Sequence, residues 1–139
     1  MRYAFSQYGV KEIVGKQHNE QIVKYFQEIG HSWVKNDETA WCSAFANWVA
    51  KLSDCEYSGK LNARSWMKVG EPTDSPLPFD VVVFWREKRT GWKGHVGFYI
   101  NEDERYIYVL GGNQKNQVNI TPYPKSQFMG YRNITKSNK

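Results

Sequence analysis

One change of pattern, close to residue 71, constrains the fold of this chain more than any other feature of its sequence. Before this point apolar residues recur at helical spacing, and after it the chain consists of short β-prone runs. The segment 71–78 between the two parts contains three prolines and reads as a turn-rich connection. Helices followed by strands are typical of α+β proteins, so we expect helices packed on an antiparallel sheet.

Two longer helices and one short helical piece are predicted in the first half. Apolar spacing indicates a helix over about 19–29, which ends at Gly30, and a second over about 41–53. Asp37 or Thr39 is the expected cap of the second helix. A short helical piece over 63–69 is expected to end at Gly70. The second helix carries its large apolar residues on one stripe, which predicts one buried face.

The second half predicts short strands, at 79–85, 95–100, 106–110, 117–121 and 129–134. We expect 95–100 and 106–110 to form a hairpin around residues 101–104. With 139 residues, the chain has the size of one domain, which we take to span residues 1–139.

The net charge of +5 favours anionic partners in general, but the basic residues are dispersed and form no block of five. No aromatic–basic motif supports nucleic-acid binding. The first residues have no apolar run of the signal-peptide kind, and no apolar run is long enough for insertion into a membrane. We therefore expect synthesis in the cytoplasm without a signal peptide.

The chain has two cysteines, Cys42 and Cys55. If residues 42–53 are helical, the two lie on the order of 20 Å apart, whereas a disulfide needs Cα atoms within about 7 Å. We therefore expect two thiols. The histidines and cysteines show no metal-ligand spacing, so we expect no metal and no other cofactor. His18 and His31 lie in polar local sequence and are expected to be exposed.

Cys42 lies at the start of the predicted second helix. Unpaired N–H groups and the positive end of the helix dipole both favour a thiolate there, and the same groups can bind an oxyanion. Position alone does not exclude the alternative that Cys42 is a small buried apolar residue, as most unpaired cysteines are.

Residues 94–100 alternate, which places His95, Gly97 and Tyr99 on one face of a strand. We interpret the small Gly97 as room for the helix that presents Cys42. If Ile100 pairs with Tyr106, His95 lies opposite Gly111 and on the same face as Asn113. A bulge at Gly111–Gly112 could bring Asn113 closer, so that its amide orients the imidazole. Gln114, Asn116 and Glu102 remain alternatives for that role.

Several segments, in order, resemble the CHAP family (cysteine, histidine-dependent amidohydrolases/peptidases), and within it a phage- and prophage-associated subgroup. The resemblance covers about residues 4–132, and its segments are 9–13, 37–45, 63–66, 79–84, 94–99, 110–114 and 130–132. The family usually has Pro-Gly-Asp before the first of its core strands, and this chain has Pro78-Phe79-Asp80. This departure concerns the geometry of one turn.

The resemblance implies a papain-like fold, in which a nucleophile helix packs on a small antiparallel sheet or half-barrel. It implies a Cys42 nucleophile, a His95 base and an Asn113 orienting residue, which act as a thiolate–imidazolium pair and form a thioester acyl-enzyme. The substrate would be an amide bond of bacterial peptidoglycan, cut by an endopeptidase or an N-acetylmuramoyl-L-alanine amidase. Trp41 is expected to line the substrate cleft together with Asp37, which is equally placed to cap the helix. Trp66 and Trp92 are weaker candidates for the cleft.

A phage lysin or a secreted antibacterial effector would act in the periplasm or cell wall after release or secretion. Its partners would be peptidoglycan and, in addition, an immunity protein or a phage release or secretion system. Two alternatives share the fold: a catalytically silent module that binds the cell wall, and an acyltransferase that uses the same thiolate. Thiol reactivity distinguishes the first alternative, and diversion of product to an amine acceptor distinguishes the second.

Overall fold

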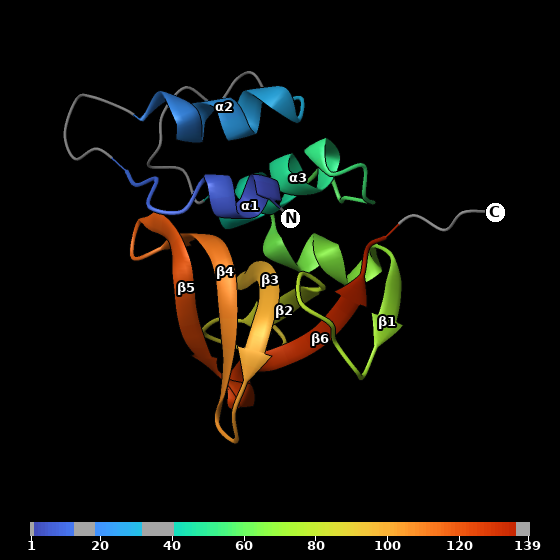
Figure 1. Ribbon diagram of the computed structural model, residues 1–139. Helices are drawn as coiled ribbons and strands as arrows, with labels where there is room; N and C mark the ends of the chain where they lie inside the picture. Colours follow the sequence, from blue (N-terminus) through green and yellow to red (C-terminus); the bar gives the residue numbers. More distant parts are fainter. Residues whose placement is uncertain (1, 13–18, 32–40, 136–139) are drawn as a thin grey trace.

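Helices and a six-stranded antiparallel sheet form two layers in the computed structural model, which describes residues 2–12, 19–31 and 41–135 (Figure 1). The helical elements are α1 (Arg2–Ser6), α2 (Glu20–Glu28), α3 (Cys42–Leu52) and two 3-10 turns, η1 (Ala63–Lys68) and η2 (Lys125–Gln127). The strands are β1 (Glu71–Thr73), β2 (Val81–Trp85), β3 (Gly94–Glu102), β4 (Tyr106–Gln114), β5 (Gln117–Pro124) and β6 (Phe128–Asn133). Their order in the sheet is β1-β6-β2-β3-β4-β5. The α+β class predicted from the sequence is confirmed.

The helix α2 covers the side of α3 that faces away from the sheet (Figure 1). Its start is capped by Asn19, whose side chain accepts a hydrogen bond from the Gln21 N–H at 2.8 Å. Its apolar side buries Ile22, Tyr25 and Phe26 against α3. The predicted limits of this helix, 19–29, agree with the structure to within one residue.

The helix α3 is buried on all sides, and not only along the predicted stripe. Phe45 lies between the layers, with its ring 5.4 Å from that of Tyr25 and 6.4 Å from that of Phe98 on β3. The polar residues Ser43 and Asn47 are also buried, and both donate side-chain hydrogen bonds to the Lys60 carbonyl. Although α3 is apolar, neither it nor any other helix in the described residues is long enough to cross a membrane.

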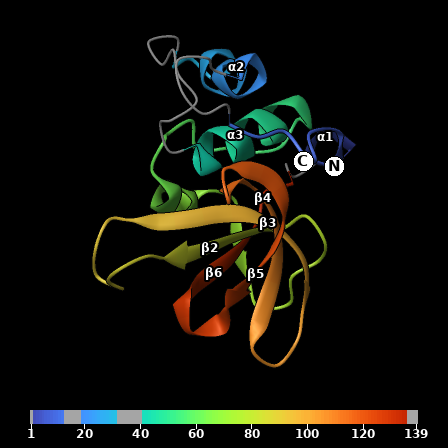
Figure 2. The same ribbon diagram turned by 90° about the vertical axis from the view of Figure 1, so that its left-hand side faces the viewer.

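The two faces of the sheet carry separate apolar clusters. One face packs against the helices through residues such as Val81, Val96 and Phe98. The other face holds Val82, Phe84, Tyr99, Ile107, Val109 and Tyr131. This second cluster needs no helical cover because the sheet curls, which is visible in the two perpendicular views (Figures 1 and 2). The resulting half-barrel is the form expected of a papain-like domain.

The connection 71–78 and the turn after it differ from a plain loop. Residues 71–73 form β1, which pairs with β6 at the edge of the sheet and was not predicted.

Phe79 has φ +75°, a conformation that favours glycine and costs other residues roughly 1 kcal/mol. Its N–H still donates to the Tyr99 carbonyl at 2.7 Å, and its ring packs edge-on against Phe5 at 5.4 Å. The chain thus keeps the turn in the glycine conformation without a glycine.

Candidate active site

Cys42 is the first residue of α3 and follows Trp41, which occupies the N-cap position without a side-chain capping bond. The backbone N–H groups of Cys42 and Ser43 lie within hydrogen-bonding reach of the Cys42 sulfur, as expected at a helix start. A third N–H, that of Val96 on β3, also lies within hydrogen-bonding reach of the thiol. The nucleophile candidate therefore lies beside the residue that follows His95. Neither Cys42 nor Cys55 forms a disulfide.

His95 is buried on β3, and its imidazole hydrogen-bonds to the side chain of Gln114. The distance from Nε2 to the Gln114 Oε1 is 2.9 Å. The other end of the Gln114 amide is fixed, because its Nε2 donates to the carbonyls of Val109 at 3.1 Å and Asn119 at 2.8 Å. The amide must therefore present its oxygen to His95, which donates from Nε2. This arrangement leaves Nδ1 as the basic nitrogen of the imidazole.

The prediction that Asn113 contacts the imidazole is therefore wrong, and a bulge in β4 explains why. The register also differs from the expected one, since Phe98 pairs with Leu110, two residues away, and β3 has an irregularity between Tyr99 and Asn101. A shift of two residues keeps each side chain on its face, so the decisive feature is the bulge between Gly111 and Gln114 in the pairing with β5. The bulge was expected, but it leaves Asn113 at φ +58° and brings Gln114 to the His95 face.

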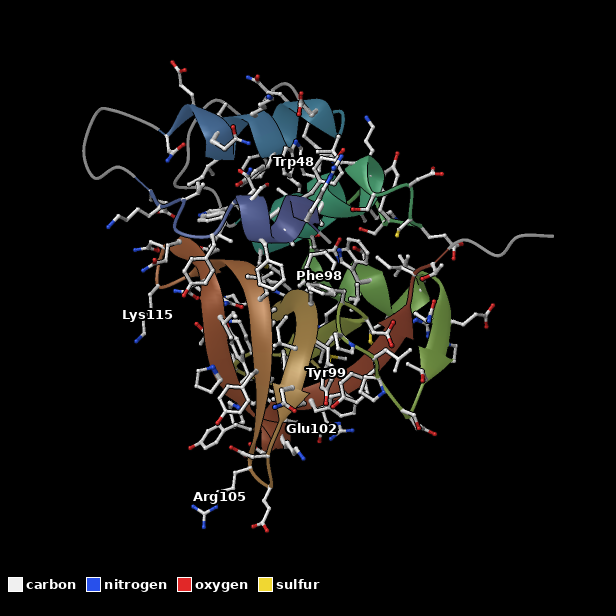
Figure 3. The ribbon with its side chains drawn as sticks, viewed as in Figure 1. Trp48, Phe98, Tyr99, Glu102, Arg105 and Lys115 are labelled. Atoms are coloured by element: carbon white, nitrogen blue, oxygen red, sulfur yellow. The ribbon has the colours of Figure 1, made fainter. Side chains whose placement is uncertain are left out.

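The alternatives Asn116 and Glu102 lie elsewhere. Asn116 is in the β4–β5 turn, with φ +63°. Glu102 is at the far end of β3, where it pairs with Lys125 at 2.5 Å and accepts a hydrogen bond from Tyr99 at 3.0 Å (Figure 3). The glycine at 97 also has another use than expected: a Cβ there would meet Val109 on β4 at 2.3 Å. The small residue makes room for the neighbouring strand, since α3 packs on the opposite face.

Residues of β5 that the sequence analysis did not single out complete the surroundings of His95. Asn119 accepts from Gln114 Nε2 at 3.0 Å and from Thr121 Oγ1 at 2.7 Å through its side-chain oxygen. The ring of Tyr123 stacks on the imidazole, with centroids 4.6 Å apart. These three residues alternate along the strand, and the two-residue period in 117–124 was the available signal that they share one face.

The ionisation states differ from the expected thiolate–imidazolium pair. Burial raises the pKa of the Cys42 thiol, and this effect outweighs the N–H groups and the positive charge of Arg86, which lower it. Burial also lowers the pKa of His95 to about 4, although the hydrogen bond to Gln114 opposes this shift. Near neutral pH the geometry therefore favours a neutral thiol beside a neutral imidazole. Alkylation of Cys42 should be slow at pH 6 and rise towards alkaline pH.

The depressed pKa of His95 predicts acid sensitivity of the fold. Unfolded, the imidazole titrates near 6.5, and folded near 4, so the unfolded state binds the proton first as the pH falls. The free energy of unfolding should therefore decrease between pH 6.5 and 4, by up to about 3 kcal/mol from this group. Urea denaturation of wild type and His95→Gln at several pH values measures the effect. The variant should show a shallower loss, and equal slopes would contradict the assignment.

Two hollows open beside the candidate residues. One is lined by Cys42, Leu61, Asn62, Ala63, Arg86, Glu87, Trp92, Lys93, Gly94 and Asn113. The other is lined by Phe84, Trp85, Arg86, His95, Asn113, Gln114, Lys115, Thr121, Tyr123 and Gln127. Arg86 and Asn113 line both, so the two hollows are adjacent. We name them the Cys42 hollow and the His95 hollow.

The tryptophans predicted to line a substrate cleft have different positions in the structure. Trp41 is fully buried, its Nε1 donates to Glu12 at 2.6 Å, and its ring lies under Gly112, so the prediction that it lines a cleft is wrong. Trp66 is also fully buried. Trp92 is 72% exposed and lines the Cys42 hollow, so it is open to a substrate there. Asp37 and Thr39 lie outside the described residues, as does His18.

Within the described part of the chain, no three residues with Asp, Glu, His or Cys side chains gather as a metal site. His31, expected to be a bystander, is half-buried and hydrogen-bonds through Nε2 to the Gly59 carbonyl at 2.8 Å. It lies away from both hollows. The candidate chemistry thus depends on the Cys42 thiol and on a His95 imidazole that is hydrogen-bonded to the Gln114 amide.

The model of the CHAP domain family matches residues 33–113, which is more than half of the chain. This chain belongs to the CHAP domain family. The match includes Cys42 and His95 and ends at Asn113, one residue before the His95 partner Gln114. A search of curated proteins found no match. Membership places this CHAP domain among peptidoglycan-hydrolysing cysteine amidases and peptidases, and the α+β half-barrel agrees with that family.

Proposed function

We propose that this CHAP domain hydrolyses amide bonds of bacterial peptidoglycan, with Cys42 as nucleophile, His95 as base and Gln114 as the residue that orients His95. The observation that carries the proposal is the fixed Gln114 amide, which accepts from the imidazole Nε2 and so leaves Nδ1 as the base. Cys42 supports it by its place at a helix start beside the strand that carries His95.

The reaction follows from the neutral resting pair. The Cys42 proton passes to the His95 Nδ1 as Sγ attacks the amide carbonyl, and the oxyanion forms near the Cys42 backbone N–H. The imidazolium then gives its proton to the leaving amine, the C–N bond breaks and a thioester remains. Water loses a proton to His95, attacks the thioester and releases a carboxylic acid and the Cys42 thiol. Stacking on Tyr123 keeps the imidazole in place through both steps.

Its place of action follows from the substrate. We propose the periplasm or the cell wall, reached by phage release or by secretion, as a phage lysin or an antibacterial effector. The net charge of +5 supports attraction to anionic wall polymers. An effector would be paired with an immunity protein in the producing cell.

Purified peptidoglycan incubated with the protein in ¹⁸O-labelled water tests the function. Hydrolysis should release fragments with one ¹⁸O in each new carboxyl group, detected by mass spectrometry, because water resolves the thioester. The identity of the new amine separates an amidase, which frees the first stem-peptide residue from muramic acid, from an endopeptidase. Unlabelled products joined to an added amine would instead indicate acyl transfer, and intact peptidoglycan would refute the proposal.

A further inference from the structure

Arg86 lies between the Cys42 hollow and the His95 hollow. It follows β2 directly, is exposed and lines both the Cys42 hollow and the His95 hollow. Its charge lowers the pKa of Cys42, His95 and Tyr123, which places the guanidinium within electrostatic reach of all three. A group bound by Arg86 would therefore lie next to the reacting atoms.

The backbone that carries Arg86 is held firmly. Arg64 on η1 donates to the carbonyls of Lys88, Arg89 and Lys93, at distances of 2.7 to 2.9 Å. The Arg86 N–H also donates to the Lys93 carbonyl at 3.1 Å, which closes the base of the loop between β2 and β3. The Arg64 guanidinium is thus engaged in hydrogen bonds that hold the loop backbone. As a result, the loop presents Arg86 from a fixed position.

The Arg86 guanidinium itself has no ion pair and no side-chain hydrogen bond among the described residues. Nearby charges are already paired: among the described residues, Glu87 is the one carboxylate that lines the Cys42 hollow, and it pairs with Lys93 at 3.0 Å. No carboxylate of the described ranges lines the His95 hollow, and the second cation on it, besides Arg86, is Lys115 in the β4–β5 turn (Figure 3). The free donors of this hollow therefore suit an anion, and the planar guanidinium suits a carboxylate.

The chemistry assigns a side of the substrate to each hollow. The acyl part stays on Cys42 during the reaction, so it belongs in the Cys42 hollow. The amine takes its proton from His95, so the amine part belongs in the His95 hollow. We propose that Arg86, with Lys115 in support, binds a carboxylate on the amine side of the scissile amide and makes this enzyme specific for acidic leaving groups. This inference rests on the proposed function and deepens it.

The anion site can be tested without any hydrolysis, by alkylation of Cys42 in a Cys55→Ser background. Iodoacetate and iodoacetamide attack the same sulfur but differ in charge, so the ratio of their rates is independent of the thiol pKa. Arg86→Gln should lower the iodoacetate-to-iodoacetamide ratio roughly three- to tenfold, because the carboxylate loses its cation. Arg89→Gln, on the same loop but on neither hollow, is the matched control and should leave the ratio unchanged. An equal ratio in Arg86→Gln and wild type would overturn the proposal.

The specificity itself needs paired substrates. Two synthetic stem peptides would carry either a free carboxylate or a carboxamide on the first residue of the amine side. We expect wild type to prefer the carboxylate about tenfold in kcat/KM, Arg86→Gln to lose this preference and Arg86→Lys to keep part of it. Cleavage of both peptides at equal rates would refute the inference and leave the proposed hydrolase intact. Cleavage of neither peptide, with the alkylation ratio shifted as expected, would refute the hydrolase and support the anion site.

Discussion

Cys42→Ala is expected to reduce the release of fragments from peptidoglycan to the background level, a loss of at least about ten-thousand-fold. No other described group near the His95 hollow can form the thioester. The substitution should not unfold the protein, because alanine is smaller than cysteine and suits a helix. The measurement is the rate of fragment release, with circular dichroism to confirm the fold.

Cys55→Ala is the matched control for this experiment. Cys55 lies beyond the end of α3, where its sulfur is 3.6 Å from the Ser53 carbonyl, and it lines neither hollow. The variant should keep most of the activity. If Cys42→Ala lyses peptidoglycan as fast as wild type, Cys42 is a structural residue and the mechanism fails.

The fold was largely predictable because its signals are local. The spacing of apolar residues predicts α2 and α3, and the change of pattern near residue 71 predicts the α+β class. The burial of α3 on all sides was not predictable, since it depends on α2 lying across the helix from the sheet (Figure 1). The strand β1 was missed because its pairing with β6 joins segments about sixty residues apart, which no local pattern records.

The ionisation states of Cys42 and His95 also depend on tertiary packing, which the local sequence does not record. The helix start at Cys42 is visible in the sequence and favours a thiolate. The burial of Cys42 and His95 depends on the packing of two layers, and in the structure it outweighs the helix end. Similarly, Trp41 adjoins Cys42 in sequence but faces Gly112 and Glu12, whereas Trp92, fifty residues away, lines the Cys42 hollow. Neighbours in sequence are poor guides to a cleft that is built from loops.

The choice between Asn113 and Gln114 depends on a single residue of register. Alternation along β4 predicts that position 113 shares the His95 face, but one extra residue in the bulge transfers position 114 to that face. Gly111 is required there, because a Cβ at this position would lie 2.6 Å from the Gln114 Oε1 and 3.4 Å from the His95 Nε2. The glycine pair was visible in the sequence, and the exact length of the bulge was not.

Gln114→Ala is expected to lower turnover about a hundred- to a thousandfold, because the imidazole loses the group that fixes its tautomer and orientation. The loss should be smaller than that of Cys42→Ala, since His95 remains present. Removal of the amide also leaves the carbonyls of Val109 and Asn119 without this donor, so the free energy of unfolding should fall by about 1–3 kcal/mol. Gln114→Met fills the volume without an acceptor of comparable strength and should show the same loss of turnover.

Asn113→Gly is the matched control, since glycine adopts the left-handed conformation at φ +58° without strain and only the amide is removed. Asn113 lines both hollows, so a change of a few-fold in KM is expected, with kcat nearly unchanged. Rates are measured on a soluble peptide substrate at a temperature where every variant is folded, across the pH range. Full turnover in Gln114→Met, or a large fall of kcat in Asn113→Gly alone, would return the orienting role to Asn113 and require the bulge to rearrange when substrate binds.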